Sequence, residues 1–274
     1  MKKYRCKICG YIHEGNTPPD ICPVCKAPAS EFEEIKTEKK GMLNREGNLY
    51  TILYASVIVV LVAVMLALAA QLLGERQKRN EDIDKKRQIL TSINITSNNK
   101  TAEELYDKYI VDSYLVDGNG QKTEGDAFST ELGNILRLPE NERHYPVFEA
   151  IVDDGKKKYV LSMRGAGLWG PLWGFISFDD DRNTVYGASF GHESETPGLG
   201  AEIENSEFGN KFKGKHFFNA SGEFVSVAIV KAGKTTQEQD YVDGISGGTI
   251  TSQGVDAMLK SSIGAYEEFL KKKE

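Results

Sequence analysis

The longest feature of the hydrophobic pattern is one apolar run in the first third of the chain. No charged side chain occurs between Glu46 and Glu75, and Leu49 to Leu73 is nearly all apolar. Because a helix rises about 1.5 Å per residue, roughly 20 residues cross the hydrocarbon core of a bilayer. The run therefore predicts a transmembrane helix over residues 48–74. A buried core helix of this length would show a polar face, and a cleaved signal peptide would have a shorter apolar run.

The segment that follows this run has a different, helical pattern. Glu75 to Ile93 is charged and helix-prone, and Ile83, Ile89 and Leu90 recur on one side. This spacing predicts that residues 75–100 form a solvated helical stalk that continues the membrane helix.

From Thr101 onward, β-branched and aromatic residues alternate and are interrupted by glycine, which is typical of strands. The predicted strands are Tyr106–Val116, Val147–Val152, Lys158–Met163, Gly174–Phe178, Thr184–Phe190 and Phe224–Val230. The predicted helices are Asp126–Leu138, Ile203–Phe212 and a C-terminal helix through Val255, Met258, Leu259, Ile263 and Leu270. Strands and helices mixed in this way predict an α+β domain over residues 101–274.

Composition narrows the class of protein. The chain has 274 residues, of which 40% are hydrophobic, so it can bury a core and is not disordered. The formal net charge of -6 and the pI near 5.5 argue against a nucleic-acid partner. All four cysteines precede residue 26, which favours a reducing cytosol for the N-terminal part and an oxidising exterior for the cysteine-free remainder. Basic residues flank both ends of the apolar run, so charge alone does not orient it.

Two CxxC pairs mark a metal module over residues 1–35, followed by a linker over residues 36–47. Cys6 and Cys9 form the first pair, and Cys22 and Cys25 form the second. Four thiolates on two tight turns can occupy the corners of a tetrahedron, which suits zinc or a single iron ion. Disulfides between these cysteines are disfavoured, because CxxC loops strain such bonds.

The residues around these cysteines resemble the short rubredoxin-like modules of rubrerythrins. The matching positions are Tyr4, Cys6, Cys9, Gly10, Tyr11, Pro18, Cys22, Pro23, Cys25, Ala27, Pro28 and Phe32. The resemblance implies one iron held by four thiolates and one-electron transfer. The loop between the pairs is shorter than in full-length rubredoxins, and zinc remains the alternative metal.

A stretch of small residues precedes the C-terminal helix and predicts a second site. It contains Ser246, Gly247, Gly248, Thr249, Thr251 and Ser252. Small residues let the backbone bend closely around a bulky group, and the start of a helix favours a phosphate. Thr251 or Ser252 is expected to cap the helix. A glycine-rich turn that feeds a capped helix fits the same residues without any ligand.

The same stretch, Asp243 to Thr249, resembles the D-x-x-S/T-G-A-T flavinylation motif, in which a transferase joins flavin mononucleotide (FMN) to the last threonine through a phosphoester. The resemblance implies that Thr249 carries covalent FMN, with Thr251 as the second choice. Gly248 stands where the motif has alanine, a small-for-small change.

Two further segments resemble the G-x-G-L-W and E-T-P-G-L-G stretches of the NqrC subunits of the sodium-translocating NADH:quinone reductases (Nqr), whose domain is shared with the RnfG subunits of the Rnf complex. They are Gly165–Gly174 and His192–Gly200. Leu168 and Trp169 are expected to pack on the flavin ring, and Glu195 and Thr196 to hydrogen-bond its polar edge. Leu199, in the second segment, is also expected at the cofactor.

The resemblance implies an electron-relay subunit, not catalytic alone, of a complex that oxidises NADH, reduces a membrane quinone and exports sodium. No G-x-G-x-x-G and no P-loop occurs, in agreement with a relay that does not bind NADH. The expected partners are the other Nqr subunits, a flavin transferase and membrane lipid. The expected location is a bacterial inner membrane crossed once, with the metal module cytoplasmic and the FMN domain exterior. The alternatives are an RnfG-type subunit and a membrane-tethered zinc-ribbon binding protein without flavin.

Overall fold

The computed structural model describes residues 2–36, 48–236 and 238–272, which fall into two compact units, Met1–Gly74 and Glu75–Glu274. The predicted linker over residues 36–47 lies, apart from Lys36, outside the described residues. The two units are therefore described separately.

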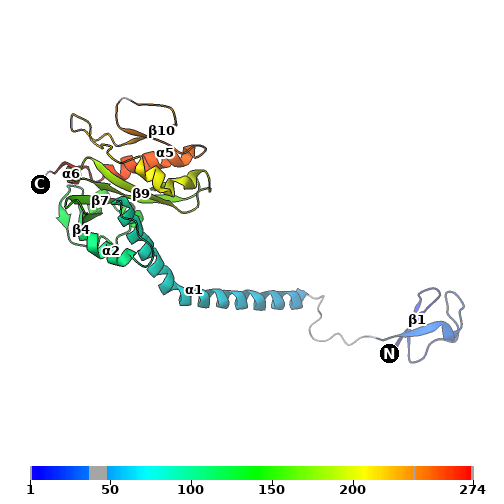
Figure 1. Ribbon diagram of the computed structural model, residues 1–274. Coiled ribbons are helices and arrows are strands. Elements are labelled where there is room, and N and C mark those ends of the chain that lie inside the picture. Colours follow the sequence, from blue (N-terminus) through cyan, green and yellow to red (C-terminus); the bar gives the residue numbers. More distant parts are fainter. Residues whose placement is uncertain (1, 37–47, 237, 273–274) are drawn as a thin grey trace. The chain divides into compact units, whose positions relative to one another are not determined.

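The N-terminal unit begins with a small antiparallel sheet of order β2-β1-β3 (Figure 1). Its strands are β1 (Lys2–Cys6), β2 (Ile12–Gly15) and β3 (Phe32–Ile35), and a short 3-10 turn, η1 (Ala29–Glu31), precedes β3. Tyr4 on β1 is buried, and the buried residues Cys6, Cys22 and Ala27 form a hydrophobic cluster beside the sheet. Two of its three members are cysteines, so the fold of the module depends on what the cysteines bind.

Helix α1 (Asn48–Ser92) contains the apolar run and most of the charged segment in one continuous helix. It is long and apolar enough to cross a membrane by length and composition. Ile83, Ile89 and Leu90, which the spacing places on one side of the helix, are buried. The stalk is shorter than predicted, because the helix ends at Ser92 and Asn94 takes a left-handed conformation, with φ +61°.

The C-terminal unit is built on a six-stranded sheet of order β5-β4-β6-β7-β8-β9, in which every neighbouring pair is antiparallel. The strands are β4 (Ile110–Val116), β5 (Lys122–Thr123), β6 (Tyr145–Ile151), β7 (Lys157–Ala166), β8 (Pro171–Phe178) and β9 (Val185–His192). With helices on both faces, this is the α+β class that the sequence predicts.

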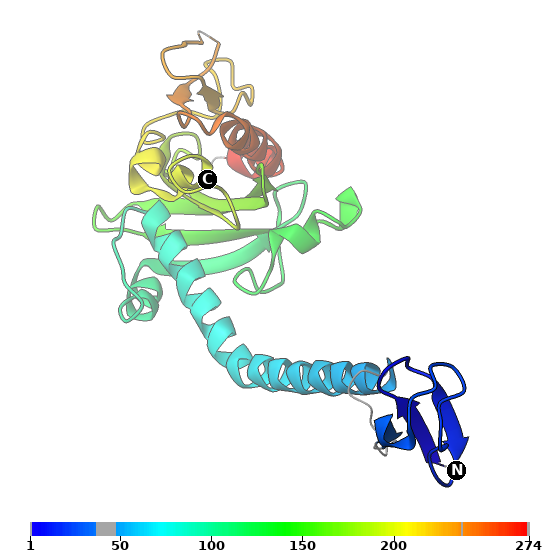
Figure 2. The ribbon, with the colours of Figure 1, turned by 90° about the vertical axis from the view of Figure 1, so that its right-hand side faces the viewer.

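Successive side chains of a strand point to opposite faces, and each face of the sheet carries its own core. Tyr159 and Leu161 face the C-terminal segments α5 (Thr249–Met258), η4 (Leu259–Ile263) and α6 (Glu267–Lys271). Val160 faces the last turns of α1 and helix α2 (Ala102–Tyr109). Figure 2 shows the red C-terminal helices and the teal end of α1 against the green sheet. The N-terminal helices α1 and α2 of this unit therefore pack on one face of the sheet, and its C-terminal helices pack on the other face.

The predicted strand over Tyr106–Val116 is wrong in its first part, because residues up to Tyr109 belong to α2. Glu103 and Glu104 lie in the first turn of this helix, where negative charge is favourable. Tyr109 is buried against the sheet, so tertiary packing overrides the strand pattern.

Two predicted helices are shorter than expected. The helix over Asp126–Leu138 reduces to α3 (Leu132–Ile135), because the Asp126 carboxylate accepts the N–H groups of Phe128 and Ser129 and holds a turn. A 3-10 turn, η2 (Glu140–Glu142), follows it. The helix over Ile203–Phe212 is divided into η3 (Gly200–Glu204) and α4 (Ser206–Asn210), because Asn205 is extended between them.

Two other predictions near the C-terminus are corrected. The strand over Phe224–Val230 reduces to β10 (Ala228–Val230), because Ser226 has φ +63°. It pairs in parallel with β11 (Tyr241–Asp243), outside the main sheet. The C-terminal helix is interrupted by the wider π-type turn η4 between α5 and α6.

Candidate functional site

Thr249 is the first residue of α5, and its side chain is exposed. The loop before it turns at Gly247, which has φ +75°, and Gly248 serves as the N-cap. The first bond along this helix is donated by Ser252 N–H to the Gly248 carbonyl, at 2.9 Å. The N–H groups of the turn that precedes this bond have no intrahelical acceptor, and the helix dipole adds positive potential there. The site therefore suits a phosphate.

The glycines of this loop allow two segments to lie in direct contact. A Cβ on Gly247 would lie 2.6 Å from Cδ2 of Leu199, and one on Gly200 would lie 2.3 Å from Oγ1 of Thr251. No larger side chain fits either position without a shift of its neighbour. The loop of Leu199 and Gly200 is thus pressed against the start of α5.

Glu195 joins a third segment to these two. Its carboxylate accepts the backbone N–H of Trp169 at 2.8 Å through Oε1 and the hydroxyl of Thr251 at 2.6 Å through Oε2. The side chain is 4% exposed. One buried carboxylate therefore connects the β7–β8 turn, its own loop and the first turn of α5.

The hydrogen bonds of Glu195 also determine its charge. Burial raises the pKa of this carboxyl, but the hydroxyl of Thr251 and the N–H groups of Trp169 and Leu168 outweigh burial, so the pKa lies below its usual value. Glu195 is consequently an anion at neutral pH.

The three segments that Glu195 connects carry apolar side chains that are not buried. Leu168, Leu199 and Ile250 are about half exposed, and Trp169 is 66% exposed. Exposed apolar groups on a folded domain are typical of a surface that another group covers. With the phosphate-binding helix start, they fit a group that combines a phosphate with a flat apolar ring.

The sequence-predicted residues of this site converge in space. Gly247 lies against Leu199, Gly248 lies against Gly200, and Glu195 and Thr251 are hydrogen-bonded. Thr196 and Ser246 are exposed on the same two loops.

The predicted cap is wrong. Thr251 and Ser252 lie inside the first turn, and Ser252 Oγ accepts the N–H of Ile245 at 2.9 Å from the preceding loop. Ile250 is not among the candidate site residues predicted from the sequence. It could have been found as an apolar residue in the first turn of α5 whose side chain is not needed for the core.

The four cysteines of the N-terminal unit form a candidate metal centre. Their sulfur atoms all lie within 4.8 Å of one another. Cys6 and Cys25 Sγ are 3.6 Å apart, and Cys9 and Cys22 Sγ are 3.5 Å apart. A tetrahedral ion with bonds of about 2.3 Å to sulfur separates its ligands by about 3.8 Å, so the cage fits one such ion.

Backbone groups of the second CxxC loop favour the thiolate form that a metal needs. Burial raises the pKa of the Cys22 thiol, but the N–H groups of Cys25 and Val24 lower it, to about 7. Cys22 is buried and Cys9 is exposed, so one side of the cage opens to the surface.

Both units match models of known domain families. Residues 167–264 match the FMN-binding domain, and residues 4–33 match the rubredoxin-like domain of rubrerythrins. The first range contains every apolar and small residue described around Thr249, and the second contains all four cysteines.

The following relatives, which match 70% to 84% of this chain, are NqrC subunits. The NqrC subunit of the Na⁺-translocating NADH-quinone reductase of Vibrio alginolyticus is 31% identical over 210 residues, which cover 70% of this chain and 81% of the relative. The Pseudomonas aeruginosa NqrC subunit is 30% identical over 84% of this chain and 97% of its own. The crystal structure of the Parabacteroides distasonis NqrC subunit shares 55% identity at a TM-score of 0.70, over 74% of this chain and 98% of that one.

Proposed function

Because this chain belongs to the NqrC family of Na⁺-translocating NADH-quinone reductase subunits, we propose that it relays electrons within such a complex through FMN joined by a phosphoester to Thr249. The family membership makes it a subunit of a multi-subunit membrane oxidoreductase with an FMN-binding domain. The covalent attachment, the relay and the coupling to sodium export are the proposal.

The exposed hydroxyl of Thr249 at the start of α5 is the observation that carries this proposal. It stands beside the turn whose N–H groups have no intrahelical acceptor, where a phosphate is favoured. The hydroxyl of Thr251, the second choice, is committed to Glu195 and buried. The geometry thus favours Thr249 over Thr251 as the accepting oxygen.

The bound flavin would supply reversible electron transfer, and the chain would supply its position and environment. Trp169, Leu168, Leu199 and Ile250 would cover the ring, while Ser246, Gly247 and Gly248 would leave room for the phosphate. The ester bond would keep the cofactor on an exterior domain, where a dissociated flavin would be lost by dilution.

Intact mass spectrometry of the full-length protein, produced with a flavin transferase, tests the attachment. Wild type is expected to carry one FMN adduct, and Thr249→Ala is expected to carry none. Thr251→Val serves as the control and is expected to retain the adduct. An adduct that persists on Thr249→Ala would exclude this residue as the acceptor.

For the N-terminal unit we propose a single iron ion that carries one electron, with zinc as the alternative. The four-thiolate cage and the match to the rubredoxin-like domain support a metal, and both ions fit the sulfur distances. Metal analysis and visible absorption of the membrane-extracted protein separate the two, because ferric thiolate is coloured and zinc thiolate is not.

We further propose that α1 crosses the inner membrane once, with the metal module in the cytoplasm and the FMN domain outside. About 30 Å of hydrocarbon would then separate the two redox centres, so other subunits must pass electrons between them. Impermeant protease added to spheroplasts, whose outer membrane is opened, should cleave only beyond the span. Stopped-flow reduction of the isolated chain should show no rapid transfer from metal to flavin.

Membership of the Nqr family favours this proposal over the Rnf alternative, and the match to the FMN-binding domain opposes a flavin-free binding protein. In-gel flavin fluorescence after denaturation distinguishes the last alternative directly.

A further inference from the structure

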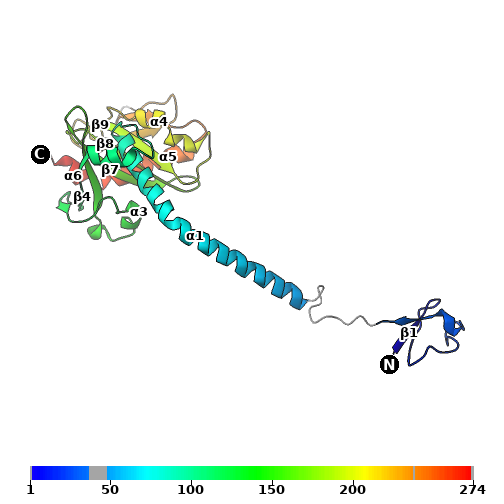
Figure 3. The ribbon, with the colours of Figure 1, turned by 60° about the horizontal axis from the view of Figure 1, so that its bottom comes forward.

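The last turns of α1 are fastened to the sheet face opposite α5. Ser177 Oγ donates to the Ser92 carbonyl at 2.6 Å, and Ser189 Oγ donates to the Gln88 carbonyl at 2.8 Å. Asn94, just beyond the helix, donates to the Tyr186 carbonyl at 2.9 Å. Figure 3 shows these turns beside β7 and β8. These bonds hold the C-terminal end of α1 on the sheet.

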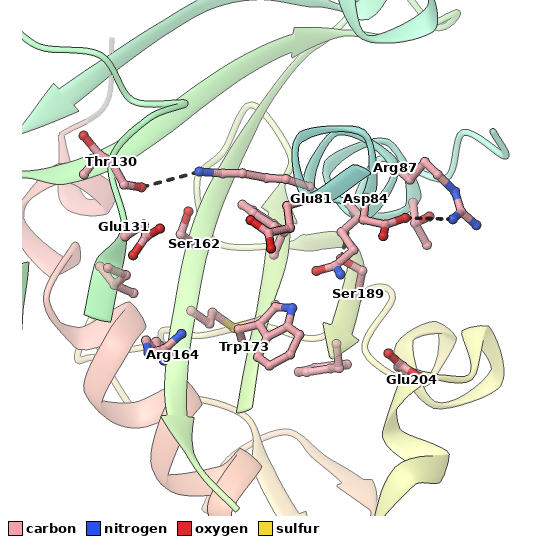
Figure 4. Close-up of a pocket in the computed structure, with 18 of the residues that line it drawn as sticks. Glu81, Asp84, Arg87, Thr130, Glu131, Ser162, Arg164, Trp173, Ser189 and Glu204 are labelled. Carbon is pink, nitrogen blue, oxygen red and sulfur yellow. Dashed lines mark hydrogen bonds and ion pairs between the residues drawn. The ribbon is translucent and has the colours of Figure 1, made fainter. Parts of the chain in front are cut away.

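A cavity of about 860 Å³ opens between α1 and the sheet. Glu81 and Asp84 line it from the helix, while Arg164 and Trp173 line it from β7 and β8 (Figure 4). We name this space the stalk cavity. All of its lining residues belong to the C-terminal unit, and none of the loops around Thr249 takes part.

Arg164 and Trp173 are partners in the β7–β8 register, and Trp173 is in turn opposite Gly191 on β9. Each side chain lies against a glycine. A Cβ on Gly133 would lie 2.7 Å from Arg164 Nε, and one on Gly191 would lie 2.6 Å from Trp173 Nε1. The two glycines therefore leave the space that the side chains of Arg164 and Trp173 occupy.

The two basic residues that enter the stalk cavity from α1 have partners. Lys85 Nζ donates to the carbonyls of Phe128 and Thr130, and Arg87 pairs with Asp84 at 3.1 Å. Within residues 2–36, 48–236 and 238–272, neither the guanidinium of Arg164 nor the indole N–H of Trp173 has an acceptor. Arg164 is also half-buried. A half-buried guanidinium without an anion has lost part of its hydration without compensation, so an acceptor from outside would stabilise it.

Acidic groups on the rim complete the charge pattern. Among the described residues the Glu81 carboxylate accepts only from Gln77 and has no basic partner, whereas the Glu131 carboxylate accepts from Asn134 and attracts the ammonium group of Lys85. An occupant must therefore bring a carboxylate to the floor and positive charge to the rim. Opposite charges a few residues apart are readily supplied by one polypeptide segment.

Resting on the membership of this chain in a multi-subunit complex, we propose that the stalk cavity receives a segment of another subunit. That segment places an Asp or Glu carboxylate on Arg164 and an apolar side chain on Trp173, and a Lys or Arg residue of the segment meets Glu81. Arginine and tryptophan are the residue types that carry most binding energy at protein interfaces. In the sequence, the first residue that lines the cavity, Glu81, follows eight positions after Leu73, where the apolar run ends.

The test uses the assembled complex, purified through a tag on a different subunit. Arg164→Glu is expected to reduce recovery of this chain about tenfold or more at moderate salt, because it places like charge against the incoming carboxylate. Arg137→Glu, the same change at an exposed residue, is expected to leave recovery unchanged. Equal recovery of the two variants would overturn the proposal. Covalent FMN, read by fluorescence on the same gels, should be unaffected, so failure here is distinguishable from failure of the flavin assignment.

A photo-crosslinking side chain in place of Gln88, which lines the stalk cavity, identifies the occupant. The expected product joins this chain to a peptide of another subunit that contains an acidic residue. Replacing that residue by Lys should restore recovery of the Arg164→Glu variant. Products confined to this chain, to lipid or to a small molecule would refute docking of a subunit.

Discussion

The hydroxyl of Thr251 donates a hydrogen bond of 2.6 Å to Glu195 Oε2, although 56 positions of sequence separate the two residues. The other oxygen of the same carboxylate holds the backbone of Trp169. The geometry of the candidate flavin site thus depends on one buried anion.

Removing this carboxylate should destabilise the domain. Glu195→Ala leaves the Trp169 N–H and the Thr251 hydroxyl without their acceptor and is expected to cost about 2–4 kcal/mol. Glu195→Gln keeps the shape and can accept from Trp169 while donating to Thr251, so it should cost much less. Thermal unfolding followed by tryptophan fluorescence measures both, because the two tryptophans of the chain lie in this domain. If Glu195→Ala and Glu195→Gln lower the free energy of unfolding equally, the shape and hydrogen bonds that Gln retains do not contribute to stability.

The same residue predicts a pH dependence. Its folded pKa is below the usual value, so it contributes stability that is present above the unfolded pKa and is lost as pH falls through the folded pKa. Between pH 6 and pH 3 the free energy of unfolding of wild type should therefore fall more than that of Glu195→Gln. Parallel pH profiles of the two proteins would contradict the assignment of an anion to this site.

Trp169 should influence the flavin without being needed for its attachment. We expect Trp169→Ala to retain the FMN adduct and to raise the midpoint potential, because water then reaches the ring and better solvates the extra negative charge of the reduced form. Spectroelectrochemical titration measures the shift. Val111→Ala, an exposed apolar residue on β4, is the matched control and should leave the potential unchanged. No shift at Trp169 would place this side chain outside the flavin environment.

Gly247 should be required for flavin attachment beyond its effect on stability. Gly247→Ala forces alanine into φ +75° against Leu199, and Gly155→Ala forces it into φ +71° with nothing within 4 Å. Both variants should lose about 1–2 kcal/mol from the left-handed backbone alone. Only Gly247→Ala should reduce FMN incorporation several-fold, as intact mass would report. Comparable incorporation by both would mean that the contact with Leu199 has no part in attachment.

Metal should be a condition of folding for the N-terminal module. Its hydrophobic cluster of Cys6, Cys22 and Ala27 is too small to stabilise the fold without an ion. Cys22→Ala is expected to make residues 2–36 sensitive to protease while the melting temperature of the C-terminal unit stays the same. Val24→Ala, an exposed neighbour, provides the control. A resistant Cys22→Ala module would show that packing alone suffices.

Elements could be predicted correctly where the residue pattern of a segment matches the environment of that segment in the folded protein. The four cysteines were found because ligand spacing in two short loops is written directly in the sequence. The strands β6 to β9 were found because both faces of the sheet are covered, so apolar residues dominate each strand. In contrast, Tyr106 to Tyr109 alternates like a strand and still forms a helix, because its aromatic side chains pack beneath the sheet.

Other features depend on contacts that no local pattern encodes. The contact of Glu195 with the flavin edge stays a prediction, but the bonds of its two oxygens to Trp169 and Thr251 were not expected, because only the tertiary fold brings these residues together. The position of the Arg164 side chain depends on two tertiary contacts. The strand register places Trp173 beside it, and α3 places Gly133 against it. Pairing of this kind appears only when the chain is folded.

The turn of the β7–β8 ribbon carries Trp169, and Arg164 and Trp173 face each other four or five positions away on its two strands. One short piece of backbone therefore serves two regions that differ in chemistry and lie on different faces of the domain. A substitution that probes the candidate flavin site therefore has to be checked for effects on the stalk cavity, and the reverse. The fluorescence emission of Trp169 and Trp173 allows this check, because each indole responds to its own surroundings.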